Sequence, residues 1–423
     1  MEQHNTGYNI HWAAGAIYTM TKTAVSSATS TATEEIHCIS YLRGLAALGV
    51  VFYHVRVDLW VGFHAFRENP SLAGTFAGFV AWLSLPTVFM SSGVMLFFVI
   101  SGFCIHYPYG GSNGKRLDLQ EYMVRRFFRI YPPYLVAVLF AFAAQGIGWH
   151  YGFLKSLDGF NYELSAFLLQ NSFGSQPECN PALWTIPVEV AFYIFFPLVY
   201  LGLRRSCFST LAAGLVISIL AIVSSLLAPI QSSFLPHWFT WIAGATLAEQ
   251  HKQGNLKQPS LGIFVLGILS FLLALLCTWH VRAGNAFVDG AGVVGLVTLA
   301  GALAYGIAFG ILLWWSLVNR WFYDLAPLSL HRFLLHLGAI SYSLYLFHIP
   351  LFRLCGWMWT SQFGEKPVNY LVTFPFVILA VVVASLAYKL VEAPAHIAGR
   401  KLAYAIKSRH AVRARAVAFP GST

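Results

Sequence analysis

Two ionisable residues, Arg43 and His54, interrupt an apolar stretch that is about long enough to cross a membrane, Ile39–Trp60. They are eleven residues apart, which in an α-helix is about three turns, or ~16 Å along the axis, so both side chains project from one face. An imidazole can take a proton from a hydroxyl, and a guanidinium can hold a phosphate or polarise a carbonyl. The spacing therefore indicates base chemistry combined with recognition of an anionic or carbonyl-bearing group.

Glu189 and His348 lie at a similar membrane depth in two other apolar stretches. Glu189 is about six residues from the outer end of its stretch, and His348 is about fourteen residues into its own. Isolated in lipid, each group would be costly, whereas in one polar cavity each could find a partner. We therefore expect both to converge with His54, where the Glu189 carboxylate would fix the tautomer of a His54 general base.

Arg125, Arg126 and Arg129 form a cluster where an anionic ligand would enter from the inner face. They could equally be ordinary positive anchors of a cytoplasmic loop, and Arg43 could be a snorkelling anchor. Structural roles, as hydrogen-bond or ion-pair partners, are also open for His54, Glu189 and His348. No pair of histidines has the spacing of a helical metal site, so we expect no bound metal.

The elements that position these residues are membrane helices. Of the 423 residues, 57% are hydrophobic and only 10% are charged, whereas a soluble chain carries roughly a quarter charged residues. The net charge of +10 would suit nucleic-acid binding only with a basic patch on a solvated domain, and the sequence contains no such domain. We therefore expect an all-α integral membrane protein whose partner is the lipid bilayer, with no nucleic acid bound.

Ten stretches are long and apolar enough to be candidate spans. They are Ile39–Trp60, Pro86–His106, Ile130–Trp149, Leu183–Leu203, Phe208–Leu227, Phe234–Gln250, Leu261–Trp279, Val293–Trp315, Leu334–Cys355 and Tyr370–Leu390. The piece Leu72–Leu85 is too short to span and could be interfacial or re-entrant. The sixth span is short, so about ten transmembrane helices are expected, with nine or eleven left open.

Basic residues concentrate in alternate loops. The loops after the second, fourth, sixth and eighth spans, and the segment after the tenth, hold most of the Lys and Arg residues. The other loops hold only Arg56, Arg67, Lys155, Arg282 and Lys366. The positive-inside bias therefore places both termini in the cytoplasm. We expect a flexible Ser/Thr/Ala-rich tail over 1–35, one membrane domain over 36–394 and a basic cytoplasmic tail over 395–423.

Six short motifs occur in a fixed order along the chain. They are Leu42–Ala47 followed by His54, Ser92–Phe103, Arg125–Pro132, Leu183–Glu189, Tyr342–His348 and Val391–Pro394. In this order they resemble the acyltransferase family 3 membrane proteins, of the O-antigen and exopolysaccharide O-acetylase type. The chain departs from many relatives at Trp184-Thr185-Ile186, where they have Trp-Ser-Leu, and at Val190, where they have a second acidic residue.

The resemblance implies a ten-helix O-acyltransferase of the bacterial inner membrane, which moves an acyl group, usually acetyl, from acyl-CoA to a carbohydrate hydroxyl. The acceptor would be a cell-surface or secreted carbohydrate or glycolipid, such as lipopolysaccharide or exopolysaccharide. By resemblance the catalytic residues are His54 as base, Glu189 and Arg43. The contacts of acetyl-CoA would be Arg43, Arg125, Arg126 and Arg129, and those of substrate would be Trp184, Tyr345 and His348.

A transporter or flippase is the main alternative. In it His54, Glu189 and His348 would relay protons, and no bond would be made. The sequence has no inverted repeat, although Pro187 and Pro350 could break two spans. A sensor or scaffold would explain the loop charges but not the buried cluster. The sequence leaves open the acceptor, the acyl chain, the oligomeric state, and direct transfer against an acyl-histidine intermediate.

Overall fold

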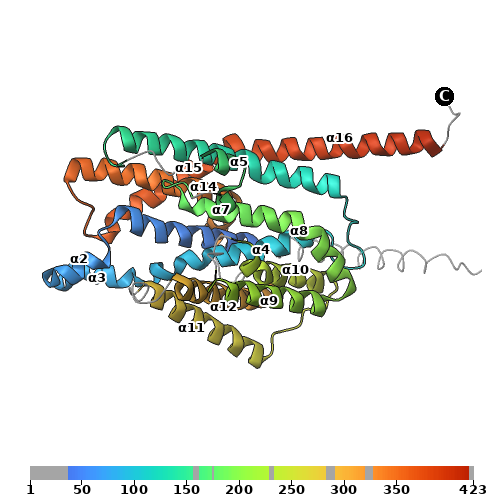
Figure 1. Ribbon diagram of the computed structural model, residues 1–423, viewed down its shortest axis with the longest axis horizontal. Helices are drawn as coiled ribbons and strands as arrows, with labels where there is room; N and C mark the ends of the chain where they lie inside the picture. Colours follow the sequence, from blue (N-terminus) through green and yellow to red (C-terminus); the bar gives the residue numbers. More distant parts are fainter. Residues whose placement is uncertain are drawn as a thin grey trace, which may run out of the picture.

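The computed structural model describes residues 37–155, 162–173, 176–227, 233–282, 291–319 and 327–418, with side chains described as far as residue 408. Every regular element in these ranges is helical. Figure 1 shows α5 and α16 along one side of the bundle and α11 with α12 along the other, with α4 and α8 between them. The predicted all-α membrane fold is confirmed, because nine helices within the described ranges are long and apolar enough to cross a membrane.

The long elements include one helix for each of the ten predicted spans, followed by α16. They are the first helix, His37–Leu59, α4 Gly93–His106, α5 Leu119–His150, α8 Thr185–Arg205, α9 Cys207–Ser224, α10 Trp238–Lys252, α11 Leu261–Arg282, α12 Ala291–Val318, α14 Leu328–Phe363, α15 Phe374–Ala387 and α16 Ala393–Ala418. The shorter ones are α2 Gly62–Glu68, η1 Pro70–Gly74, α3 Phe76–Leu83, η2 Leu85–Ser92, α6 Tyr162–Ala166, α7 Gln170–Phe173, η3 Pro181–Trp184, η4 Leu235–His237, η6 Tyr370–Thr373 and the π-helical turn η7 Tyr388–Glu392.

The sixth predicted span forms a helix, α10, but it has only 15 residues, about 22 Å of helix. It packs backbone to backbone against α4. A Cβ at Gly102 would lie 1.9 Å from the Trp241 carbonyl oxygen, and one at Gly244 would lie 1.8 Å from that of Val99. Glycine at both positions therefore permits a contact that any side chain would block.

The piece predicted as interfacial leads straight into the second span. Helix α3, the 3-10 turn η2 and α4 together form one candidate span, Phe76–His106, of 31 residues. Pro86 lies in the first turn of η2, where an N–H group would have no partner within the helix, so the proline costs no hydrogen bond. The second span therefore begins earlier than the sequence predicted.

Neither proline that could have broken a span does so. Pro187 lies in the first turn of α8, where no helical donor is lost, and α14 continues through Pro350 to Phe363. Pro350 leaves the carbonyl of Leu346, four residues earlier, without its helical partner. The Asn180 side-chain amide donates to that carbonyl at 2.8 Å. A side chain from the α8 entrance therefore caps the proline site in α14.

The last candidate span, Tyr370–Ser408, runs through α15 and η7 into α16. The predicted tail over 395–423 therefore begins inside a helix, while the predicted tail over 1–35 lies outside the described residues. Figure 1 shows α16 projecting beyond the bundle at the end where α5 begins. Lys407 of α16 and Glu121 of α5 form an ion pair there, at 3.3 Å. This is the end that the loop charges predict to face the cytoplasm.

Candidate functional site

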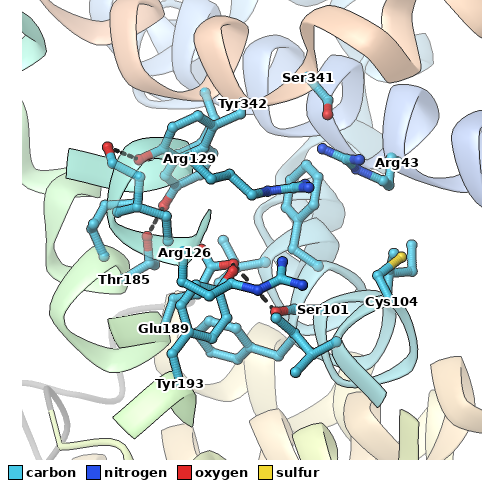
Figure 2. A pocket seen from close by; sticks show the side chains of 18 residues that line it. Arg43, Ser101, Cys104, Arg126, Arg129, Thr185, Glu189, Tyr193, Ser341 and Tyr342 are labelled. Carbon is cyan, nitrogen blue, oxygen red and sulfur yellow. Dashed lines mark hydrogen bonds between the residues drawn. The ribbon is translucent and has the colours of Figure 1, made fainter. Parts of the chain in front are cut away.

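A pocket between five helices gathers many of the predicted residues. It lies among the first helix, α4, α5, α8 and α14 and encloses roughly 750 Å³ of empty space, including the part open to solvent. Its side chains that carry polar atoms or sulfur are Arg43, Ser101, Cys104, Arg126, Arg129, Thr185, Glu189, Tyr193, Ser341, Tyr342 and Tyr345. Figure 2 shows Arg43, from the first helix, facing Arg126 and Arg129, from α5, with Glu189 beside Ser101.

Three arginines line the pocket against one carboxylate, that of Glu189. Arg43 and Arg129 lie within electrostatic range of each other and of Glu189. The Arg126 guanidinium lies over aromatic rings, 5.6 Å from the Tyr122 centroid and 5.7 Å from that of Tyr193. Positive charge therefore exceeds negative charge on the pocket wall, which suits an anionic ligand.

Arg125 does not line the pocket. Its side chain is 44% exposed and forms an ion pair with Glu121, one turn earlier on α5, at 2.6 Å. The structure thus brings Arg43, Arg126 and Arg129 together and leaves Arg125 outside.

Glu189 is held by hydroxyl groups. Its Oε1 accepts hydrogen bonds from Ser101, at 3.2 Å, and from Tyr193, one turn further along α8. Pro197 leaves the Tyr193 carbonyl without its helical donor, and the Tyr122 hydroxyl donates to that carbonyl at 3.1 Å. Pro197 of α8 and Tyr122 of α5 therefore belong to a hydrogen-bonded arrangement that fixes the Glu189 side of the pocket.

His54 and His348 lie together, outside the lining of this pocket. Their ring centroids are 5.0 Å apart. His54 is half-buried, and His348 is 1% exposed. In the part of the chain that the structure describes, Glu189 contacts Ser101 and Tyr193 and makes no hydrogen bond with His54. The expected Glu189–His54 contact is therefore absent, and the histidine's near neighbour is a second histidine.

Tyr345 lines the pocket and also packs beside His348. Its ring is 6.0 Å from Phe97, in the pocket lining, and 5.9 Å from His348. Its hydroxyl donates to the Ala182 carbonyl at 2.9 Å and accepts from Thr185 at 3.0 Å. Thr185, which stands where many relatives have serine, thus helps to fix this ring.

Trp184 lies outside the lining of this pocket, and its role as a substrate contact stays a prediction. It ends the 3-10 turn before α8 and is absent from the pocket lining, with its ring 5.7 Å from His237 and 6.4 Å from Phe98. Its proposed substrate contact has no geometric support from this pocket.

Glu392, which the sequence analysis did not assign, lies outside the pocket lining but interacts with two of the pocket arginines. It ends the π-helical turn η7, is 2% exposed and accepts a 2.6 Å hydrogen bond from Ser343. It interacts electrostatically with Arg43 and Arg129. The motif Val391–Pro394, which contains Glu392, was the available signal in the sequence. The structure adds the π-helical turn, a feature that frequently occurs at functional sites. Among the residues described, no group of three His, Cys, Asp or Glu side chains could hold a metal ion.

The fold and the pocket define a polytopic helical membrane protein with an internal site that is rich in arginine side chains. A family model described as "Acyltransferase domain" (Acyl_transf_3) matches residues 36–390, so the chain belongs to the acyltransferase 3 family. The resemblance drawn from the six motifs is thereby confirmed.

One similar protein is "Putative peptidoglycan O-acetyltransferase YrhL" of Bacillus subtilis (strain 168). It is 24% identical over 392 residues, covering 84% of this chain and 54% of the relative. The chain therefore spans about half the length of that curated relative. No solved structure matches the chain.

Proposed function

We propose that the protein is a membrane O-acyltransferase, which moves an acyl group, most readily acetyl, from acyl-CoA to a carbohydrate hydroxyl. The observation that carries the proposal is the arrangement along the bundle. Tyr345 lines the arginine-rich pocket, its ring lies 5.9 Å from that of His348, and His348 lies 5.0 Å from His54. A pocket that suits an anionic donor thus neighbours the candidate base through the Tyr345 and His348 side chains.

The donor would lie in the pocket. Arg126 and Arg129, near the cytoplasmic start of α5, would bind phosphate groups of CoA through their planar guanidinium forks. The thin pantetheine arm would pass Arg43 and bring the thioester to His54. Eleven residues of helix separate Arg43 from His54, and the resulting ~16 Å is of the order of the length of that arm.

His54 would then act as general base. It takes the proton of the acceptor hydroxyl, whose oxygen attacks the thioester carbonyl, and the carbon–sulfur bond breaks. The His54 imidazolium returns the proton to the departing thiolate, giving an ester and free CoA with no net change in protons. This direct transfer needs no covalent enzyme intermediate.

The acceptor would be a bacterial cell-envelope glycan, reached from the outer half of the inner membrane. The name of the relative makes peptidoglycan the first acceptor to test. Lipopolysaccharide and exopolysaccharide carry the same chemical group, a sugar hydroxyl, and come next.

The test uses purified protein in proteoliposomes with radiolabelled acetyl-CoA and peptidoglycan fragments, comparing the parent with His54→Ala. His64→Ala is the matched control, because His64 is an exposed histidine on α2 that pairs with Glu68. We expect acetyl transfer that His54→Ala abolishes and His64→Ala preserves. Failure of the parent to consume acetyl-CoA with any glycan would overturn the proposal and favour a transporter.

A further inference from the structure

His348 is a buried imidazole with one unsatisfied nitrogen. Its Nδ1 lies 3.0 Å from the carbonyl oxygen of Leu344. A carbonyl only accepts, so Nδ1 must carry the proton. In the neutral ring Nε2 is then a bare lone pair, and it has no hydrogen-bond partner within the described residues. Leaving a buried polar atom unpaired is costly, which is a reason to look for the donor it serves.

Several contacts hold the His348 ring in place. His348 lies two residues before Pro350, where Asn180 caps the freed carbonyl of Leu346. Aromatic rings flank it, Tyr345 at 5.9 Å and Phe352 at 6.0 Å between centroids. The side chain is therefore held rather than free to turn toward solvent.

Of the rings packed against His348, that of His54 is the nearest and carries an N–H that can be donated. The two ring centroids are 5.0 Å apart and the planes are tilted by 57°. That separation leaves about one hydrogen-bond length between nitrogens that face each other. No carboxylate hydrogen bonds to His54 in the described ranges, since Glu189 is engaged by Ser101 and Tyr193.

We infer that Nε2 of His348 accepts the N–H of His54 and so fixes the tautomer of the base, which makes His348 a positioning residue. The inference rests on the proposed function of His54. With one nitrogen of His54 donating to His348, the other carries the lone pair that takes the hydroxyl proton. The same contact stabilises the imidazolium, as a carboxylate does in a Ser-His-Asp triad. This role differs from the substrate contact that the family resemblance implied for His348.

The kinetic test compares His348→Leu, which cannot accept a hydrogen bond, with His348→Gln, which keeps an acceptor oxygen. His237→Leu measures the general effect of removing a buried imidazole, because His237 is 3% exposed. For His348→Leu we expect kcat to fall about 100-fold with KM for acetyl-CoA within about twofold of the parent. His348→Gln should recover about tenfold of that loss.

Three results would overturn the inference. A raised KM for the glycan at parental kcat would make His348 a substrate contact. Equal losses in the Gln and Leu variants, with matching loss of thermal stability, would make it a structural residue. If His348→Leu kept the parental kcat, His348 would have no role in catalysis. An inactive parent would instead refute the proposed function.

If the parent protein is inactive, a measurement that does not depend on turnover still tests the inference. Nitrogen-15 NMR of histidine-labelled protein in liposomes reports which ring nitrogen carries a proton, and His54→Asn identifies the His54 signals. We expect one defined His54 tautomer in the parent and mixed tautomers in His348→Leu. An unchanged His54 spectrum in His348→Leu would refute the contact.

Discussion

The side-chain amide of Asn180 donates a 2.8 Å hydrogen bond to the carbonyl of Leu346, which Pro350 leaves without a helical donor. Asn180 is fully buried, so Asn180→Ala should leave that carbonyl unpaired and destabilise the protein by about 1–3 kcal/mol. In a Pro350→Ala background the restored N–H can serve the same carbonyl, so the loss should be smaller. Thermal unfolding of the four proteins in detergent completes the double-mutant cycle. Additive losses would show that the two residues do not share one carbonyl.

The neighbouring arginines of α5 should behave differently. Arg126 lines the pocket, whereas Arg125 is exposed and paired with Glu121. Charge-assisted hydrogen bonds are worth about 1.5–3 kcal/mol, so Arg126→Ala should raise KM for acetyl-CoA by about tenfold or more. Arg126→Lys should not restore it, because an ammonium lacks the planar fork. Arg125→Ala is the control and should leave KM near the parental value, since an exposed pair contributes little. A larger effect from Arg125→Ala would contradict this placement of the donor.

A substitution at Glu392 tests whether this carboxylate balances the charge of the pocket arginines or contacts the donor directly. Glu392→Gln keeps the shape and can keep the hydrogen bond from Ser343 while removing a negative charge near Arg43 and Arg129. The arginines lose compensation, so the thermal midpoint should fall, while the more positive pocket should bind CoA at least as tightly as before. Unfolding scans with and without CoA, together with calorimetric titration, measure both effects. Weaker CoA binding at an unchanged midpoint would indicate a direct contact with the donor instead.

The fold followed from the sequence because span length and apolarity are direct consequences of bilayer thickness. The site followed less completely. Counting residues from the ends of the predicted spans did not decide which groups meet. Glu189 lines the pocket with Arg43, whereas His54, about three turns further along the first helix, lies outside that lining. Viewed down α5, Arg129 lies between Arg125 and Arg126, since successive residues turn by about 100°. Spacing alone therefore could not decide which of the two flanking arginines faces the pocket.

The contact of α4 with α10 predicts a large difference between glycines. At Gly244 a Cβ would meet the Val99 carbonyl oxygen at 1.8 Å, so Gly244→Ala must push two helices apart and should abolish stable expression or lower the thermal midpoint sharply. At Gly146, in α5, the added Cβ would meet no atom within 4 Å among the described residues, apart from its own stretch of helix. Gly146→Ala should be neutral or stabilising by up to about 1 kcal/mol, because alanine favours helix. Similar midpoints for the two variants would show that α4 and α10 are not in backbone contact.

Cys104 allows donor binding to be observed without turnover. It lines the pocket, so a small thiol reagent should modify it, and desulfo-CoA, which has no thiol of its own, should protect it.

Cys179 is the internal control, since it lies outside the pocket lining and is fully buried. Burial also raises the pKa of its thiol to about 11, which leaves only about one thousandth as reactive thiolate at pH 8. Labelling of Cys179 should therefore stay low at pH 8 and rise only as pH approaches that value or the protein unfolds. Mass spectrometry of the labelled peptides reads both sites in one sample. Equal modification of Cys104 with and without desulfo-CoA, at concentrations that support turnover with acetyl-CoA, would place the donor outside this pocket.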